Sequence, residues 1–211
     1  MKIIFANPKN QDTNLVAQQR KETLIEYLKQ MGVYGAGFQR IIEDLSKTDY
    51  FYGPSSTKWH AAYPGGGFDH SFNVTQCLVE MTQRLGLQWQ RSVSPYIVGL
   101  FHDVTKCGAY LMKQERNPLT NEIETWYEYN PEHKKLSEIH GEDSLLKVKE
   151  MIPLTEEEEA CIRWHMGAYE GKESWSGFDE AIKKFPNVLF THTADMYASK
   201  CMEDRLEDKH A

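Results

Sequence analysis

The feature that most constrains this chain is an apolar segment that ends directly in a histidine and an aspartate. The segment covers residues 96–101, and His102 and Asp103 follow it without a break. Burying an imidazole and a carboxylate is costly unless a partner satisfies both groups. A divalent metal would do so, because both groups are good ligands for metals such as zinc, iron or manganese. A histidine and an aspartate hydrogen-bonded to each other in a core is the other interpretation, and the pair alone leaves both open.

Lys106 extends this motif by one helical turn. The Ser-Pro pair at residues 94–95 is suited to the start of a helix, and we expect that helix to end near Gly108. Within it, Lys106 lies four residues after His102 and three after Asp103, so the three side chains share one face. The lysine could then reach an anion held by the metal.

Further histidines and one further aspartate occur in segments with a helical pattern. His70 lies at the inner edge of an apolar stripe with helical spacing, which begins near Phe68 and ends before Gly86. A lone histidine in that position is more often a satisfied core residue, but here it is one member of an ordered set. The other members are His140 in a helix predicted over 137–151, His165 near the end of a helix that starts at 155, and His192 and Asp195 in a helix predicted over 187–206.

The order His, His-Asp, His, His, Asp resembles the HD-domain superfamily of metal-dependent phosphohydrolases. The resemblance spans roughly Trp59 to Lys200 and depends on the ordered set with helices between its members. It implies one or two divalent metal ions per chain, among which manganese, iron, nickel, cobalt, zinc and magnesium are not distinguished. It also implies a ligand set that consists of His70, His102, Asp103, His140, His165 and Asp195.

The resemblance divides these ligands between two positions. His70, His102, Asp103 and Asp195 would hold the first metal, and Asp103 is the ligand placed to bridge two metals. His140 and His165 match positions that bind a second metal in dinuclear members such as phosphodiesterases. In mononuclear nucleotidase members the equivalent region binds the substrate phosphate instead. Two metals about 3.5–4 Å apart could share an attacking hydroxide and both polarise a phosphate.

Two shorter motifs resemble particular branches of the superfamily. The Tyr-Pro-Gly-Gly-Gly loop at residues 63–67 resembles the loop that precedes the first metal histidine in the HD domain of certain bacterial 3′-5′ exoribonucleases. Lys106 resembles the lysine of the His-Asp-x-x-Lys signature in cyclic dinucleotide phosphodiesterases. Here the two middle residues are Val104 and Thr105, where that group usually has an aliphatic residue and glycine, and its Gly-Tyr-Pro motif is absent in place. This departure argues against hydrolysis of cyclic dinucleotides.

Helical patterns dominate the chain, so we expect an all-α fold, an HD-domain helical bundle. Residues 1–55 would form an N-terminal helical extension packed on the core, and residues 56–205 the HD domain. A polar and aromatic insertion at about 108–134 contains an alternating stretch, 121–129, that suits a short β-hairpin. The insertion is either a lid that shapes substrate choice or a surface hairpin without a catalytic part.

Three local expectations concern charged residues. The first helix, predicted over 13–31, would leave Arg20 in solvent. The residues from Thr155 to Glu158 form a capping box, with acidic side chains at the positive end of the next helix, so the glutamate run needs no functional explanation. The charged stretch 200–210 is expected to fray into solvent.

Composition excludes several classes of protein. The net charge of −7 over 211 residues argues against a broad surface for duplex nucleic acid, which usually carries excess positive charge. The four cysteines are scattered without a Cys-x-x-Cys pair, which argues against a zinc ribbon or a disulfide framework. No apolar run approaches the roughly 20 residues that span a bilayer, and the amino terminus does not resemble a signal peptide. We therefore expect a cytoplasmic protein without a membrane partner, of undetermined oligomeric state.

These observations lead to three hypotheses. The first is a phosphohydrolase that acts on nucleotides or deoxynucleotides through metal-activated water. The second is a phosphodiesterase or 3′-5′ exonuclease that acts on short oligonucleotides or cyclic nucleotides, and the third is a nucleotide-binding regulator without turnover. The complete ligand set argues against the third. The residues expected to act in catalysis are Asp103 and Lys106, and those expected to contact substrate are Lys106, His60, His192 and Tyr169.

Overall fold

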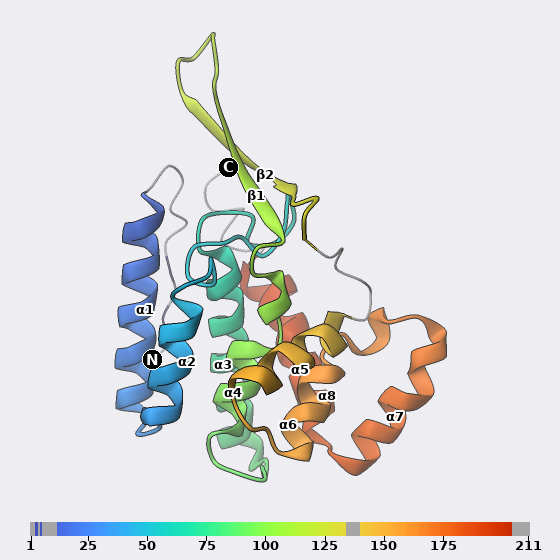
Figure 1. The fold of residues 1–211 in the computed structure, drawn as a ribbon. Coiled ribbons are helices and arrows are strands. Elements are labelled where there is room, and N and C mark those ends of the chain that lie inside the picture. The colour runs from blue at the N-terminus through green and yellow to red at the C-terminus, as the bar shows by residue number, and fades with distance from the viewer. Residues whose placement is uncertain (1–2, 4, 6–11, 134–139, 204–211) are drawn as a thin grey trace. The chain divides into compact units, whose positions relative to one another are not determined.

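The computed structural model describes residues 3, 5, 12–133 and 140–203, and over these residues the protein is mainly α-helical with one small antiparallel sheet (Figure 1). This confirms the expectation of a helical fold with a small hairpin. None of the described helices is both long and apolar enough to cross a bilayer. The elements are α1 (Thr13–Gln30), α2 (Ala36–Leu45), α3 (Gly66–Leu85), α4 (Ser94–Phe101), β1 (Tyr110–Arg116), β2 (Ile123–Tyr129), α5 (His140–Met151), α6 (Glu156–Arg163), α7 (Trp175–Lys184) and α8 (Asn187–Tyr197).

The chain divides into two compact units. The first consists of the described parts of Met1–Asp69 and Lys106–Lys135, and the second of the described parts of His70–Thr105 and Leu136–Ala211. The limits that the sequence suggested for an extension and an HD domain stay predictions.

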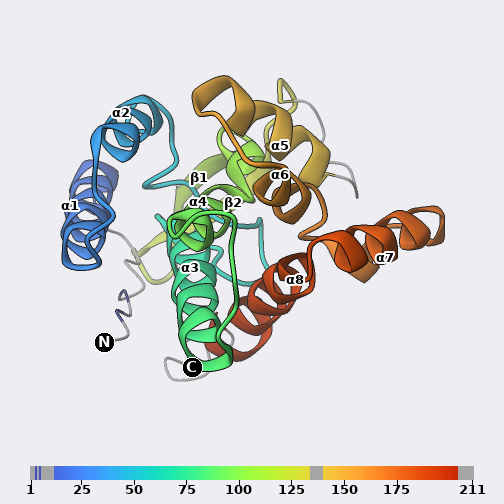
Figure 2. The ribbon, with the colours of Figure 1, turned by 90° about the horizontal axis from the view of Figure 1, so that it is seen from below.

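In the first unit, α1 and α2 lie side by side (Figures 1 and 2). The side chain of Asp12 accepts a hydrogen bond from the backbone N–H of Asn14 and so begins α1. Each helix buries one apolar face, as amphipathic helices do. The buried residues are Val16, Leu24, Tyr27 and Leu28 in α1 and Phe38, Ile41, Ile42 and Leu45 in α2.

Arg20 corrects one expectation, because it lies in the interior and not in solvent. Its exposed fraction is 2%. Its Nε and Nη2 donate to the two carboxylate oxygens of Asp69 at 2.7 and 2.6 Å, a bidentate ion pair. Gly65 has a φ of +83°, and a Cβ there would lie 2.2 Å from Arg20 Nε. The glycine is therefore needed because the guanidinium passes directly over the backbone.

The predicted hairpin is present in the first unit. β2 covers most of the alternating stretch, and it pairs antiparallel with β1 from Tyr110↔Tyr129 to Arg116↔Ile123. The rings of Tyr110 and Tyr129 meet edge to face with centroids 5.9 Å apart. Whether this hairpin acts as a lid stays a prediction.

In the second unit, α6 packs against α4, α5 and α8, and Figures 1 and 2 show α5 and α6 as neighbours. The expected capping box is present at its start, where the Thr155 hydroxyl accepts from the N–H of Glu158 and the Glu158 carboxylate accepts from the N–H of Thr155. Glu158 also forms a bidentate pair with Arg91. The acidic run thus serves the start of α6 and the loop before α4.

Replacing Arg20 with methionine should lower the free energy of unfolding by about 3–5 kcal/mol, because it leaves the Asp69 carboxylate buried without its cation. Urea unfolding followed by far-ultraviolet circular dichroism measures the change. Lys47→Met is the matched control, since it removes a solvent-exposed ion pair with Asp44, and exposed pairs contribute little to stability. Equal unfolding free energies for Arg20→Met and the wild type would contradict a stabilising role of the buried pair.

Candidate metal centre

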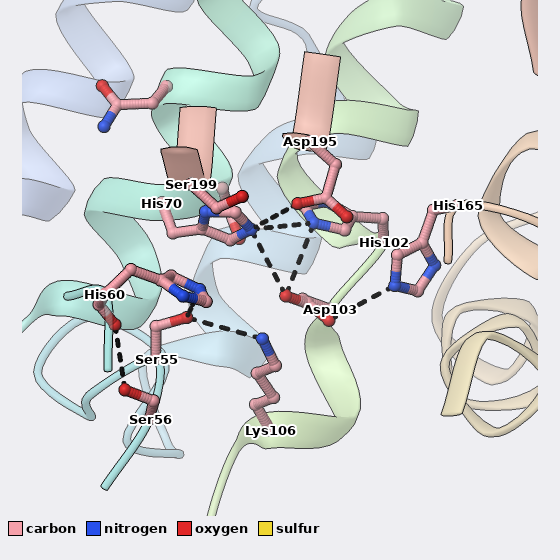
Figure 3. Close-up of polar contacts among 12 residues, drawn as sticks. Ser55, Ser56, His60, His70, His102, Asp103, Lys106, His165, Asp195 and Ser199 are labelled. Carbon is pink, nitrogen blue, oxygen red and sulfur yellow. Dashed lines mark hydrogen bonds and ion pairs between the residues drawn. The ribbon is translucent and has the colours of Figure 1, made fainter. Parts of the chain in front are cut away.

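The six residues predicted as metal ligands come together within the second unit. Figure 3 shows His70, His102, Asp103, His165 and Asp195 pointing toward one another. Among these six residues, three groups have ligand atoms within 4.8 Å of one another: His70, His102 and Asp103; His102, His165 and Asp195; and Asp103, His140 and His165. All but Asp195 are buried. This cluster could hold a divalent metal and is compatible with an HD-type site.

The cluster is drawn from five segments of the chain. His70 stands in the first turns of α3, and His140 is the first residue of α5. His165 follows the end of α6, and Asp195 lies on α8. His102 and Asp103 follow α4 directly, so the end of one apolar helix delivers two adjacent ligands.

The helix that carries His102 is shorter than predicted. α4 ends at Phe101, His102 caps it, and a short 3₁₀ turn covers Val104–Lys106. The helical argument that set Lys106 on one face with His102 and Asp103 is therefore wrong. Lys106 belongs to the first unit, where its Nζ lies 3.5 Å from Ser55 Oγ. Its role in catalysis and substrate binding stays a prediction from the resemblance.

A close crossing of α4 over α3 brings His102 to His70. A Cβ on Gly99 would lie 2.6 Å from the Cα of Thr75 and 2.5 Å from its Oγ1. Only glycine permits this approach, because real Cβ atoms do not come so near to backbone. The Nε2 atoms of His70 and His102 consequently lie 3.4 Å apart.

Asp103 uses its two carboxylate oxygens toward two different pairs of histidines. Oδ2 lies 3.5 Å from the Nε2 atoms of both His70 and His102. Oδ1 lies 3.1 Å from Nε2 of His140 and 3.5 Å from Nε2 of His165. One carboxylate thus divides the cluster into two halves, which we call the His70 half (His70, His102, Asp195) and the His140 half (His140, His165).

Backbone carbonyls determine which imidazole nitrogens face the cluster. Nδ1 of His102 donates to the carbonyl of Gly99 at 2.9 Å, and Nδ1 of His165 donates to the carbonyl of Ile162 at 2.8 Å. A carbonyl only accepts, so in the neutral rings Nε2 is the nitrogen that carries the lone pair. Both lone pairs face oxygens of Asp103, and two facing acceptors repel unless a cation lies between them. The donor set therefore fits a divalent metal, as is usual for ligand histidines held by backbone carbonyls.

The two halves differ in charge. Burial by itself lowers the pKa of His70, but the carboxylates of Glu203 and Asp195 outweigh it and raise that pKa to about 10. Burial would raise the pKa of the Asp195 carboxyl, whereas the hydrogen bond and charge of His70 hold it below its usual range. Burial also lowers the pKa of His165, and there the contact with Asp103 does not compensate. The His70 half attracts positive charge, and a proton and a metal compete for the same nitrogen there.

The residues expected to contact substrate lie in two places. His60 is in the first unit, with its Nε2 3.4 Å from Ser55 Oγ (Figure 3). His192 is in the second, and its Nδ1 donates to the carbonyl of His165 at 2.8 Å, so it supports the backbone of a ligand. Tyr169 is 58% exposed, with its ring 6.3 Å from that of His192. Their contacts with substrate stay predictions.

Glu203 is a residue of this site that the sequence did not reveal. It falls in the charged stretch expected to fray, yet it is 2% exposed and its Oε1 accepts from Nδ1 of His70 at 3.0 Å. If α8 continued as a regular α-helix, Glu203 would follow Asp195 by eight residues and would point about 80° away from it around the helix axis. The sequence therefore gave no reason to expect Glu203 beside His70.

Comparison with known proteins adds no family to this description: no protein-family model, no curated protein and no solved structure matched the chain. Its likeness to the HD superfamily accordingly depends on the residues of the cluster and their order.

Gly99→Ala should lower the free energy of unfolding by about 1–3 kcal/mol, because the added methyl group must push α4 away from Thr75. The same displacement should reduce the metal content measured by inductively coupled plasma mass spectrometry. Gly37→Ala in α2 is the control, since a Cβ there meets nothing within 4 Å and alanine favours a helix. Unchanged stability and metal content in Gly99→Ala would contradict the close crossing.

Asp103→Asn should abolish metal uptake in both halves, because an amide cannot supply two anionic oxygens. Protein incubated with manganese and then desalted would be measured by the same mass spectrometry, and the wild type should retain up to two ions per chain. Asp179→Asn is the matched control, since that carboxylate pairs only with exposed Lys183 on α7 among the contacts described for it. Wild-type metal content in Asp103→Asn would overturn the bridging role.

Proposed function

We propose that this protein is an HD-type phosphohydrolase that uses divalent metal to hydrolyse phosphate esters or anhydrides of nucleotides or deoxynucleotides. The observation that carries the proposal is the position of Asp103, whose two oxygens face two separate pairs of imidazoles. A structural histidine–aspartate pair would need one such contact, not four. The order of the ligands along the chain, which resembles the HD superfamily, supports the same conclusion.

A divalent metal bound in this cluster would polarise a phosphoryl oxygen. It would also lower the pKa of a bound water, so that a hydroxide nucleophile is available at neutral pH. The chain's own residues prepare the cluster for it. Backbone carbonyls hold the rings of His102 and His165 with Nε2 inward. His192 in turn holds the backbone of His165. Burial of these ligands strengthens their attraction for a cation, because electrostatic interactions are less screened away from solvent.

One sequence feature behind the oligonucleotide alternative is the segment at residues 63–67, which resembles a loop of certain exoribonucleases. In the structure the last two of its three glycines, at residues 65–67, already belong to α3, and packing within the first unit explains each of them. A Cβ would meet Arg20 at Gly65, the carbonyl of Ala61 at 2.0 Å at Gly66, and the carbonyl of Pro54 at 3.2 Å at Gly67. The likeness of this loop to that of exoribonucleases therefore does not favour a nucleic-acid substrate over a mononucleotide.

The proposal is tested by supplying the purified protein with manganese and a panel of nucleoside mono-, di- and triphosphates. Liquid chromatography should detect release of phosphate, pyrophosphate or triphosphate from some members, and the product names the bond that is cut. Asp103→Asn should abolish the release, and Asp179→Asn should retain it.

Two further arms separate the alternatives. Cleavage of a short oligonucleotide or a cyclic dinucleotide, with no mononucleotide turned over, would replace the proposal by the phosphodiesterase alternative. If the protein holds its full metal content and binds nucleotides but turns over none of these substrates, the result would favour the nucleotide-binding regulator.

A further inference from the structure

We propose that Glu203 is a positioning residue for the metal centre, which holds the His70 ring with Nε2 toward the cluster and makes the His70 half the tighter metal position. The inference rests on the metal centre of the proposed function and adds to it a residue outside the ligand set.

The contacts of Glu203 hold its carboxylate in one place. Its Oε1 accepts from Nδ1 of His70 at 3.0 Å and from Nδ2 of Asn73 at 3.4 Å. His70 and Asn73 are three residues apart on α3 and so lie on one face of that helix. The carboxylate is 2% exposed, and water does not compete for these bonds. The orientation of the His70 ring is therefore determined by a buried anion.

A π-helical turn explains how Glu203 reaches His70. α8 ends at Tyr197, and the π turn covers Ala198–Glu203. Hydrogen bonds in such a turn span five residues, so the turn takes up one extra residue. Counting that residue, Glu203 lies within about 20° of Asp195 around the helix, where a regular α-helix would put it about 80° away. One helix thereby presents two carboxylates to one imidazole, with Asp195 Oδ1 3.1 Å from Nε2.

The Nδ1 partner of His70 differs in charge from those of His102 and His165. The Nδ1 atoms of His102 and His165 donate to uncharged carbonyls, whereas Nδ1 of His70 donates to a carboxylate. A carboxylate partner raises the basicity of a ligand histidine as well as orienting it. Asp103 faces both halves, but His70 also lies beside Asp195 and Glu203, so among the described residues the His70 half has two further carboxylates. We therefore expect the first metal ion to bind in the His70 half.

Cobalt(II) titration of the metal-free 211-residue chain tests this proposal without substrate. The visible absorption of bound cobalt reports each ion as it enters. Glu203→Ala should weaken the first cobalt ion by about 10–100-fold, the usual effect of removing such a partner. Glu203→Gln keeps an oxygen that accepts from Nδ1 but removes the charge, so its affinity should fall between those of Glu203→Ala and the wild type. Glu180→Gln, an exposed glutamate on α7, is the control.

The outcomes separate this inference from the proposed function. A wild type that takes up no cobalt would overturn the metal centre and the proposed function with it. A wild type that binds cobalt, with equal first-ion affinity in Glu203→Gln and Glu203→Ala, would overturn the positioning role alone. A residue that only stabilises the fold would lower the melting temperature of the metal-free protein without changing the cobalt affinity of the folded variant. Should Glu203→Ala fail to fold, the graded loss in Glu203→Gln decides the matter.

Discussion

The structure depends on one electrostatic constraint, the convergence of imidazole lone pairs and carboxylate oxygens on buried Asp103. Its two oxygens face four histidines at 3.1–3.5 Å, and the rings of His102 and His165 are held with their lone pairs inward. The Nε2 atoms of these two neutral rings and the oxygens of Asp103 only accept, and such groups cannot satisfy one another in a region from which water is excluded. A positive charge would resolve this conflict, and the fold brings together ligands that could hold a cation in either half.

The packing of the second unit serves that constraint. α4 is apolar almost throughout, and it crosses α3 at Gly99 so closely that a single methyl group would separate them. The crossing sets the distance between His70 and His102. α6 contacts α4, α5 and α8, which carry or precede other ligands, and its own end leads to His165. A change in this packing should therefore alter the metal centre and the stability together.

Much of the local structure was predictable because it follows from short-range physics. The helical periods, the capping box at Thr155 and the presence of a hairpin all depend on residues a few positions apart. The predictions that failed involve partners distant in sequence. Arg20 was expected in solvent, but Asp69, 49 residues away, pairs with it in the interior. Lys106 was expected on a helix that in fact ends at Phe101, and no local feature of the sequence marks that end.

The sequence by itself determined the chemistry of the candidate site: which histidines and aspartates are present, their order, and the helices that carry most of them. Only the tertiary structure decided how they meet. It assigned the two oxygens of Asp103 to different histidines. It also turned Glu203 toward His70 through a π turn that the hydrophobic pattern of the sequence does not predict. The physical reason is that ligand identity is a property of single residues, whereas the direction of a lone pair depends on packing and hydrogen bonds between segments far apart in the chain.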